Sequence, residues 1–130
     1  MKSTGTDDTE RLGAELARLL RAGDTVWLYG ELGAGKTAFT RGLARGLGIT
    51  EQVTSPTYAI ANEYAGALTH IDAYRLSGPD ELYGAGFDED APGIRVVEWA
   101  ERAGNGVRGI CVMITVAGED ERDISLCYWP

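Results

Sequence analysis

Residues 30–37 carry the clearest chemical signal in the sequence. They read GELGAGKT and match the phosphate-loop pattern G-x-x-x-x-G-K-[ST]. In a loop of this kind the backbone N–H groups point at phosphate oxygens, the lysine reaches the β- and γ-phosphates, and the hydroxyl is placed for Mg²⁺. The pattern therefore predicts that Lys36 and Thr37 bind the phosphates and the magnesium ion of a nucleotide.

Two carboxylates that end short apolar runs are candidates to complete such a site. Asp72 follows the run 68–71, and Glu98 follows the run 94–97. A phosphate-loop enzyme needs an acid beside the loop, because Mg²⁺ prefers oxygen ligands and the attacking water must be oriented. We assign Glu98 to the magnesium ion and Asp72 to positioning or deprotonating the water, while the reverse assignment stays open.

The segments on either side of the loop have the pattern of the elements that must hold it. Thr25–Tyr29 is an apolar run of β-forming residues that predicts a buried strand, and residues 37–47 predict a helix. A strand, a glycine-rich turn and a helix in this order place the positive end of the helix dipole at the phosphates. The alternative is a glycine-rich turn with an incidental lysine. It would require the loop motif, the preceding strand and the following helix to occur together by chance.

The N-terminal segment predicts an amphipathic helix over residues 9–21 that packs on the core. Apolar residues recur there at helical spacing, with charged residues on the other face. The apolar positions are Leu12, Leu16, Leu19 and Leu20, and the candidate caps are Thr6, Asp7, Asp8 and Thr9.

The rest of the chain predicts short strands and a mixed sheet. Strands at 58–64 and 67–73, joined by a turn at Ala65-Gly66, indicate a hairpin rather than a parallel crossover. The other expected elements are a helix at 79–86, a helical turn at 100–103, and strands at 94–97, 110–116 and 122–128. We therefore predict the α/β class, as a P-loop NTPase-like three-layer fold with a mixed central sheet, in a single domain spanning residues 1–130.

Charge and apolar patterning limit the partners. A net charge of −8 argues against a basic surface that grips nucleic acid by itself, so any role with RNA should run through a partner protein. No apolar run approaches the roughly 20 residues needed to cross a bilayer. We therefore expect a cytoplasmic protein without a membrane partner.

The cysteine and histidine residues point away from a structural metal or a disulfide framework. Cys111 and Cys127 lie in apolar runs without metal-ligand spacing, and we expect them to be reduced core residues rather than a disulfide. His70 is the only histidine, which argues against a zinc site of clustered cysteine and histidine ligands.

Four segments beyond the loop carry a resemblance to a known family. They are SPTY at 55–58, NEY at 62–64, HIDAYRL at 70–76 and EW at 98–99. Together with GELGAGKT, in this order and at these spacings, they resemble the TsaE family, once called YjeE. The resemblance covers residues 6–102, and the sequence departs from it after Trp99, where AERAGNG lacks the proline-rich turn common in relatives.

This resemblance implies a small ATPase needed for threonylcarbamoylation of the adenosine beside the anticodon in tRNAs that read codons beginning with A. It implies binding to the TsaB–TsaD heterodimer and contact with tRNA only through that complex. ATP and Mg²⁺ would be the cofactors, with weak hydrolysis alone that supports turnover of the complex. Threonylcarbamoyl transfer itself would belong to TsaD.

Carried over by position, the resemblance implies three groups of site residues. The catalytic group is Lys36, Asp72 and Glu98, and the magnesium-associated residues are Thr37 and Glu98. A nucleotide-sensitive switch loop would contain Ser55, Pro56 and Thr57. The nucleotide-binding residues would be Thr6, Leu32, Gly33, Ala34, Gly35, Lys36, Thr37 and Ala38.

Two other functions fit the same loop. A small-molecule kinase would also need an arginine-bearing lid and an acceptor pocket, and no segment looks long enough for both. A non-catalytic assembly factor that uses ATP only as a clamp would draw on the same residues as the ATPase. A GTPase is disfavoured because the guanine-reading N-K-x-D is absent.

Overall fold

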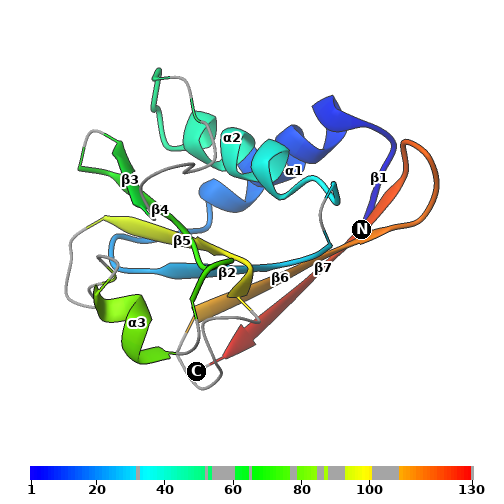
Figure 1. The fold of residues 1–130 in the computed structure, drawn as a ribbon. Coiled ribbons are helices and arrows are strands. Elements are labelled where there is room, and N and C mark those ends of the chain that lie inside the picture. Colours follow the sequence, from blue (N-terminus) through cyan, green and yellow to red (C-terminus); the bar gives the residue numbers. More distant parts are fainter. Residues whose placement is uncertain are drawn as a thin grey trace.

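The computed structural model describes residues 1–31, 33–51, 53, 61–64, 66–76, 79–84, 87, 93–100 and 109–129. The elements are β1 (Lys2–Ser3), α1 (Thr6–Ala17), β2 (Thr25–Tyr29), α2 (Lys36–Gly46), β3 (Ala61–Tyr64), β4 (Leu68–Asp72), α3 (Pro79–Gly84), β5 (Ile94–Glu98), β6 (Gly109–Val116) and β7 (Arg122–Trp129). In this part of the chain the two longer helices, α1 and α2, alternate with strands in the N-terminal half, and strands predominate after them (Figure 1).

The described strands form one mixed sheet in the order β1-β7-β6-β2-β5-β4-β3. The four central strands, β6, β2, β5 and β4, run parallel to one another. Antiparallel pairs occur at both ends, where β7 pairs with β6 and with β1, and β3 pairs with β4. The predicted hairpin and the mixed sheet are therefore confirmed.

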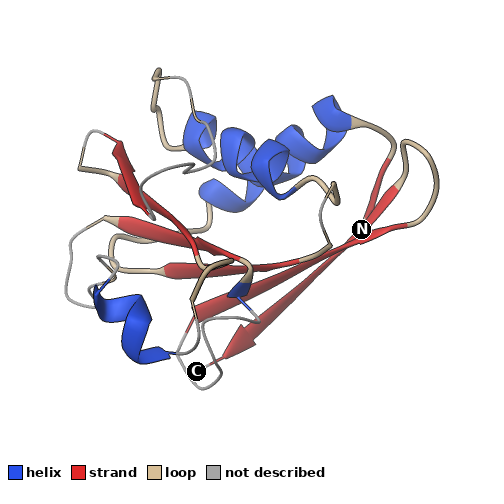
Figure 2. Ribbon diagram, viewed as in Figure 1, coloured by secondary structure: helices blue, strands red, loops and turns tan. Residues whose placement is uncertain are grey.

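Helices cover both faces of the sheet, so the fold has three layers. Helices α1 and α2 lie together on one face and α3 lies on the other (Figures 1 and 2). On the first face Val96 of β5 packs in one apolar cluster with Leu16 of α1 and Leu43 of α2. On the second face Trp27 of β2 and Leu82 of α3 belong to a separate cluster. This arrangement confirms the predicted three-layer α/β fold class.

Helices α1 and α2 pack backbone against backbone. A Cβ atom added at Gly42 of α2 would lie 1.8 Å from the Glu10 carbonyl oxygen of α1, and one added at Gly13 would lie 2.2 Å from the Phe39 carbonyl oxygen. These separations are far inside van der Waals contact, so only glycine allows the approach. The close packing fixes α2, and with it the end of the phosphate loop, against α1.

The start and the end of α1 differ from the sequence prediction. The helix begins at Thr6 after an extended Gly5, without a side-chain cap, so the predicted capping residues are wrong. It ends at Ala17, and Leu19 is 76% exposed rather than part of the core. Residues 18–24 turn toward β2 instead, where the Arg21 N–H donates to the Asp24 carboxylate at 2.7 Å and Gly23 has a φ of +95°.

The cysteine prediction is half wrong. Cys111 is buried, but Cys127 is exposed, and both thiols are free. The two residues are direct cross-strand partners in the β6–β7 pair. Cys127 lies in the part of β7 that β1 does not pair with, since β1 is opposite only Arg122 and Asp123.

Parts of four predicted elements lie outside the described residues. They are residues 58–60 of a strand, Ala65 of the hairpin turn, residues 85–86 of a helix and residues 101–103 of a helical turn. The short strand β1 has no counterpart in the prediction, because two residues carry no periodic pattern.

In the described part of the chain, no helix has the length and apolar character needed to span a membrane.

Candidate functional site

The phosphate loop joins the end of β2 to the start of α2. Gly33 and Gly35 have φ angles of +79° and +106°, a left-handed conformation that residues with a side chain rarely adopt. Gly35 caps α2 without a side-chain hydrogen bond, so the first-turn N–H groups of the helix face the loop. The local sequence thus produces a strand, a glycine-rich turn and a helix in the predicted order, although Leu32 lies outside the described residues.

The loop is open beside the two glycines. A Cβ atom added at Gly33 would meet nothing within 4 Å, and one added at Gly35 would touch only the Thr9 Cγ2 atom, at 3.7 Å. Gly30 is different, because a Cβ there would lie 2.8 Å from the Ile114 carbonyl oxygen of β6. The loop therefore packs against the sheet at its start and has free space at Gly33 and Gly35.

Lys36 is almost buried, and its ammonium group faces an aromatic ring. Its Nζ donates to the Gly30 carbonyl oxygen at 2.5 Å and lies 3.3 Å from the centre of the Trp99 ring. Such a cation–π contact is worth more where water is excluded, and Lys36 is 6% exposed. Trp99 has a φ of +56° and packs against Tyr74, with ring centres 5.0 Å apart and the ring planes tilted by 59°. The structure thus places the Trp99 ring beside the Lys36 ammonium group.

The two predicted acids lie side by side at the edge of the sheet where the loop begins. Glu98 is the register partner of Leu28 in β2 and of Asp72 in β4. Because these strands are parallel, their carboxyl ends share one edge, which is where open α/β sheets bind ligands. Glu98 is on the strand next to the loop and Asp72 is one strand further away, an order that favours Glu98 for the magnesium ion. Both roles remain predictions.

The surroundings of the two acids differ. Glu98 is 3% exposed, and its Oε2 atom lies 2.8 Å from Nε2 of the fully buried His70. Asp72 is partly exposed, and its Oδ1 atom accepts a hydrogen bond from the Tyr74 N–H at 2.9 Å. The partly exposed acid is accessible to water, whereas the buried acid is held in place.

Arg122 of β7 is hydrogen-bonded to the backbone of the phosphate loop. Its Nε donates to the Ala34 carbonyl oxygen at 3.1 Å, and its Nη2 donates to that of Gly33 at 3.2 Å. Its Nη1 donates to the carbonyl oxygens of the β6–β7 turn at Gly118, Glu119 and Glu121. Sequence reasoning missed Arg122 and the contact of His70 with Glu98, because both connect segments that are distant along the chain. The sequence signal that could have pointed to His70 is its place in HIDAYRL, one of the segments that carry the family resemblance.

Thr6 lies beside the loop, at the start of α1. A cavity of about 110 Å³ lies between them and is lined by Gly5, Thr6, Thr9, Gly33, Ala34, Gly35, Ala38, Asp120 and Arg122. A wider, more open hollow is lined by residues 4–8 and Arg11, but it does not include the loop. The smaller cavity is therefore the better candidate for part of a nucleotide.

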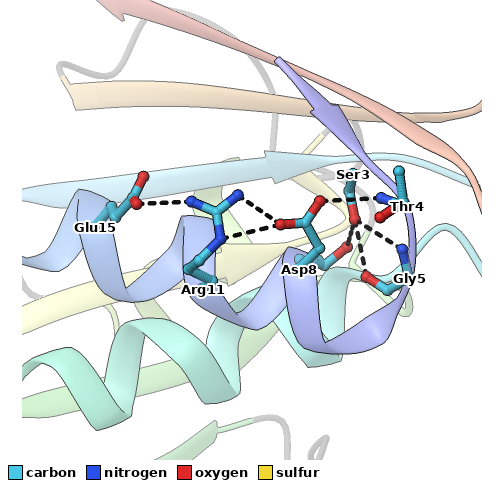
Figure 3. A network of polar contacts seen from close by, with 7 residues as sticks. Ser3, Thr4, Gly5, Asp8, Arg11 and Glu15 are labelled. Atoms are coloured by element: carbon cyan, nitrogen blue, oxygen red, sulfur yellow. Dashed lines mark hydrogen bonds and ion pairs between the residues drawn. The ribbon is translucent and has the colours of Figure 1, made fainter.

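A polar network holds the N-terminal segment in this position (Figure 3). The Ser3 hydroxyl contacts the Thr9 hydroxyl at 2.6 Å, and the Thr4 N–H donates to the Asp8 carboxylate at 3.1 Å. Arg11 donates to Asp8 and to Glu15 along the helix, and its hydrogen bond lowers the pKa of the Asp8 carboxyl group. Asp8 therefore stays ionised at the positive end of α1.

The donor set fits ATP with magnesium. The loop offers backbone N–H groups and one ammonium group, and Thr37 and Glu98 offer oxygen ligands. No group of three or more histidine, cysteine, aspartate or glutamate residues in the described ranges could hold a metal ion alone. In phosphate sites Mg²⁺ is bound by one or two protein carboxylates together with the substrate phosphates. The predicted switch-loop residues Ser55, Pro56 and Thr57 lie outside the described residues.

Comparison with known proteins gives one consistent result. The model of the family described as "Threonylcarbamoyl adenosine biosynthesis protein TsaE" matches residues 3–124. A Treponema pallidum protein named tRNA threonylcarbamoyladenosine biosynthesis protein TsaE is 40% identical over 130 residues, covering 95% of this chain and 96% of the relative. A Streptomyces coelicolor protein of the same name is 53% identical over 97 residues, covering 69% and 66%.

The structural comparison agrees with the sequence matches. The crystal structure of YdiB from Bacillus subtilis matches with a TM-score of 0.76 and 36% identity, covering 98% of this chain and 83% of YdiB. The family match also includes β6 and the start of β7, where the sequence alone offered no distinctive motif. The chain therefore belongs to the TsaE family of threonylcarbamoyladenosine biosynthesis proteins.

Proposed function

We propose that this protein is the ATPase of tRNA threonylcarbamoyladenosine biosynthesis. It binds ATP with Mg²⁺ in the phosphate loop, hydrolyses it slowly alone, and does so faster when bound to TsaB–TsaD. The observation that carries the proposal is the position of four residues at the carboxyl ends of neighbouring parallel strands. Lys36 and Thr37 begin α2 directly after the loop, Glu98 ends β5 and Asp72 ends β4. Membership of the TsaE family supports the pathway.

Lys36 and Thr37 would bind the phosphates. The ammonium group of Lys36 donates a hydrogen bond to the Gly30 carbonyl oxygen at the start of the loop. It could therefore exchange this hydrogen bond for one to a phosphate oxygen without a large movement of the side chain. Thr37 is in the first turn of α2, where its hydroxyl can ligate a cation held beside the phosphates. When bound, Mg²⁺ would neutralise charge on the phosphates and polarise the transferred group.

Asp72 would orient or deprotonate the attacking water. Its hydrogen bond from the Tyr74 N–H fixes the carboxylate, and its partial exposure gives water a path to it. Glu98, on the neighbouring strand, would hold the magnesium ion. The residues of this chain thus supply positioning and charge, which are the main protein contributions to phosphoryl transfer.

The partners follow from the proposed pathway. TsaB and TsaD would form the complex that this protein serves, and tRNA would be reached through them in the cytoplasm. The net charge of −8 supports indirect contact with tRNA, because a strongly acidic protein repels a polyanion.

ATP hydrolysis measured with and without TsaB, TsaD and substrate tRNA tests the proposal. We expect slow release of phosphate by the protein alone and a faster rate with the full set. Lys36→Ala, assayed in the same mixtures, should show no stimulation. Nucleotide-dependent binding to TsaB–TsaD without any hydrolysis would support the assembly-factor alternative, and a phosphorylated small-molecule product would support the kinase alternative. Either result would overturn the proposal.

A further inference from the structure

Glu98 is a buried acid that depends on a partner for its orientation. A carboxylate has two oxygens that accept hydrogen bonds, and a buried one without partners is costly. Here Glu98 is 3% exposed and its Oε2 atom lies 2.8 Å from Nε2 of His70. The direction in which the carboxylate points is therefore tied to the position of the imidazole ring.

The sheet fixes that ring. His70 is in β4, between β3 and β5, and its register partner in β5 is Val96, two residues before Glu98. Side chains alternate along a strand, so His70 and Glu98 lie on the same face and meet diagonally across the β4–β5 pair. His70 is 0% exposed, so surrounding packing leaves the ring little freedom.

The direction of this hydrogen bond follows from the form of the carboxyl group. An ionised carboxylate only accepts, so with Glu98 in that form Nε2–H of His70 is the donor to Oε2. Nδ1 is buried and has no hydrogen-bond partner within the described ranges. In the Nε2–H tautomer Nδ1 carries a lone pair, so no N–H group is left buried without an acceptor at this position.

We infer that His70 is the positioning residue for Glu98: it donates Nε2–H to Oε2 and so directs the carboxylate toward the magnesium ion beside the phosphate loop. The inference rests on the proposed function, because it gives Glu98 a magnesium ion to hold. Hydrogen-bond partners of metal ligands commonly affect metal affinity by about ten- to hundredfold. His70 touches neither the nucleotide nor the metal in this scheme.

Three substitutions separate this role from simple packing. His70→Gln can place an amide N–H close to the position of Nε2, His70→Asn is polar but too short to reach Glu98, and His70→Leu fills the space without a donor. The magnesium concentration for half-maximal binding of a fluorescent ATP analogue is the measurement. We expect an increase of about tenfold or more for Leu and Asn and near-normal binding for Gln. Binding in EDTA should be the same in all four proteins.

Leu68→Ala provides the matched control. Leu68 is buried at the other end of β4, so its truncation destabilises the same strand without removing the donor to Glu98. An unchanged magnesium dependence in the Leu and Asn variants, equal impairment in the Gln variant, or an equal shift in Leu68→Ala would each overturn the inference. Should His70→Leu fail to fold, the comparison of Gln with Asn decides the result. Failure of wild-type protein to bind the analogue with magnesium would instead count against the proposed function.

A second measurement needs no nucleotide. His70 is the only histidine, so a sample with ¹⁵N-labelled histidine gives one pair of ring nitrogen signals. We expect Nε2 to carry a hydrogen, and the Nε2–H signal to shift in Glu98→Gln. An Nε2 atom without a hydrogen would overturn the inference whatever the nucleotide assays show.

Discussion

At the scale of single residues, Lys36 shows how the loop keeps a cation in a nearly dry site. A buried ammonium group requires compensation, and the Gly30 carbonyl and the Trp99 ring supply it. Both contacts are weaker than those with a doubly charged phosphate group. Lys36 is therefore held ready in the orientation that phosphate binding requires.

Replacing Lys36 tests this arrangement. A ligand at a hundredfold excess over its Kd stabilises the folded state by about 2.7 kcal/mol. We expect wild-type protein to show a rise in Tm with MgATP and Lys36→Ala to lose it, as measured by thermal denaturation. Lys2→Ala is the matched control, since Lys2 is the only other lysine and is exposed. A full rise in Tm for Lys36→Ala would contradict the phosphate-binding role.

Replacing Asp72 should separate an effect on ATP hydrolysis from an effect on ATP binding. Because it is one strand further from the loop than Glu98, Asp72→Ala should bind MgATP with near-normal affinity. Loss of a general base or water-positioning group lowers rates by about 10²- to 10⁴-fold, and we expect hydrolysis to fall in that range. Asp123→Ala, an exposed acid on β7, serves as the control. Equal turnover of Asp72→Ala and wild type would remove Asp72 from the mechanism.

The sequence identified the residues that act locally and missed those that act at a distance. The loop glycines, Lys36 and Thr37 are recognisable because their spacing produces the cradle directly. Arg122 reaches Gly33 from the far end of the chain, and no local pattern indicates such a bond. The same holds for the hydrogen bond of His70 with Glu98, which depends on the register of β4 against β5.

At the scale of elements, the α1–α2 contact is the tightest constraint that the structure reveals. Gly→Ala within a helix is normally favourable, by about 1 kcal/mol. At Gly42 the new methyl group would instead meet the Glu10 carbonyl, so steric overlap outweighs the gain in helix propensity. Sequence patterns predicted both helices, yet they could not show that the helices touch through their backbones.

Gly42→Ala should therefore destabilise the protein. Forcing extra volume into a packed contact typically costs about 1 to 3 kcal/mol, measured here as a loss in the free energy of unfolding by denaturant titration. Gly118→Ala is the matched control, because its added Cβ would make only ordinary contacts with the Glu121 side chain. A Gly42→Ala protein as stable as wild type would show that α1 and α2 can move apart without cost.

At the scale of the whole molecule, the strand order brings three distant segments to one edge. The loop after β2, the end of β5 and the end of β4 are separated along the chain but adjacent in the sheet. The sequence predicted every strand except β1 from alternation and apolar runs, and the mixed sheet from the hairpin with its turn at Ala65-Gly66. It also predicted that both acids lie beside the loop. No local pattern encodes the strand order, so only the fold shows that the strand of Glu98 is the one next to the loop.

Partner binding is the test that belongs to this scale. If ATP sets the conformation that TsaB–TsaD recognises, tagged protein should retain the heterodimer with MgATP and release much of it in EDTA. Lys36→Ala should show the low level of retention in both conditions, as quantified by pull-down. No co-elution under any condition would leave a generic ATPase, whereas equal retention with and without nucleotide would remove the ATP dependence.

The contact between Lys36 and Trp99 gives the unlabelled protein an optical reporter. Indole emission responds to a nearby positive charge, and Trp99 has one 3.3 Å from the centre of its ring. Trp27, by contrast, is 1% exposed and packs in the cluster of the α3 face. Arrival of a triphosphate that draws the ammonium group away from the indole would change tryptophan fluorescence, which a stopped-flow instrument can record after mixing. Occupancy of the loop could then be followed in real time, with natural ATP and without a dye.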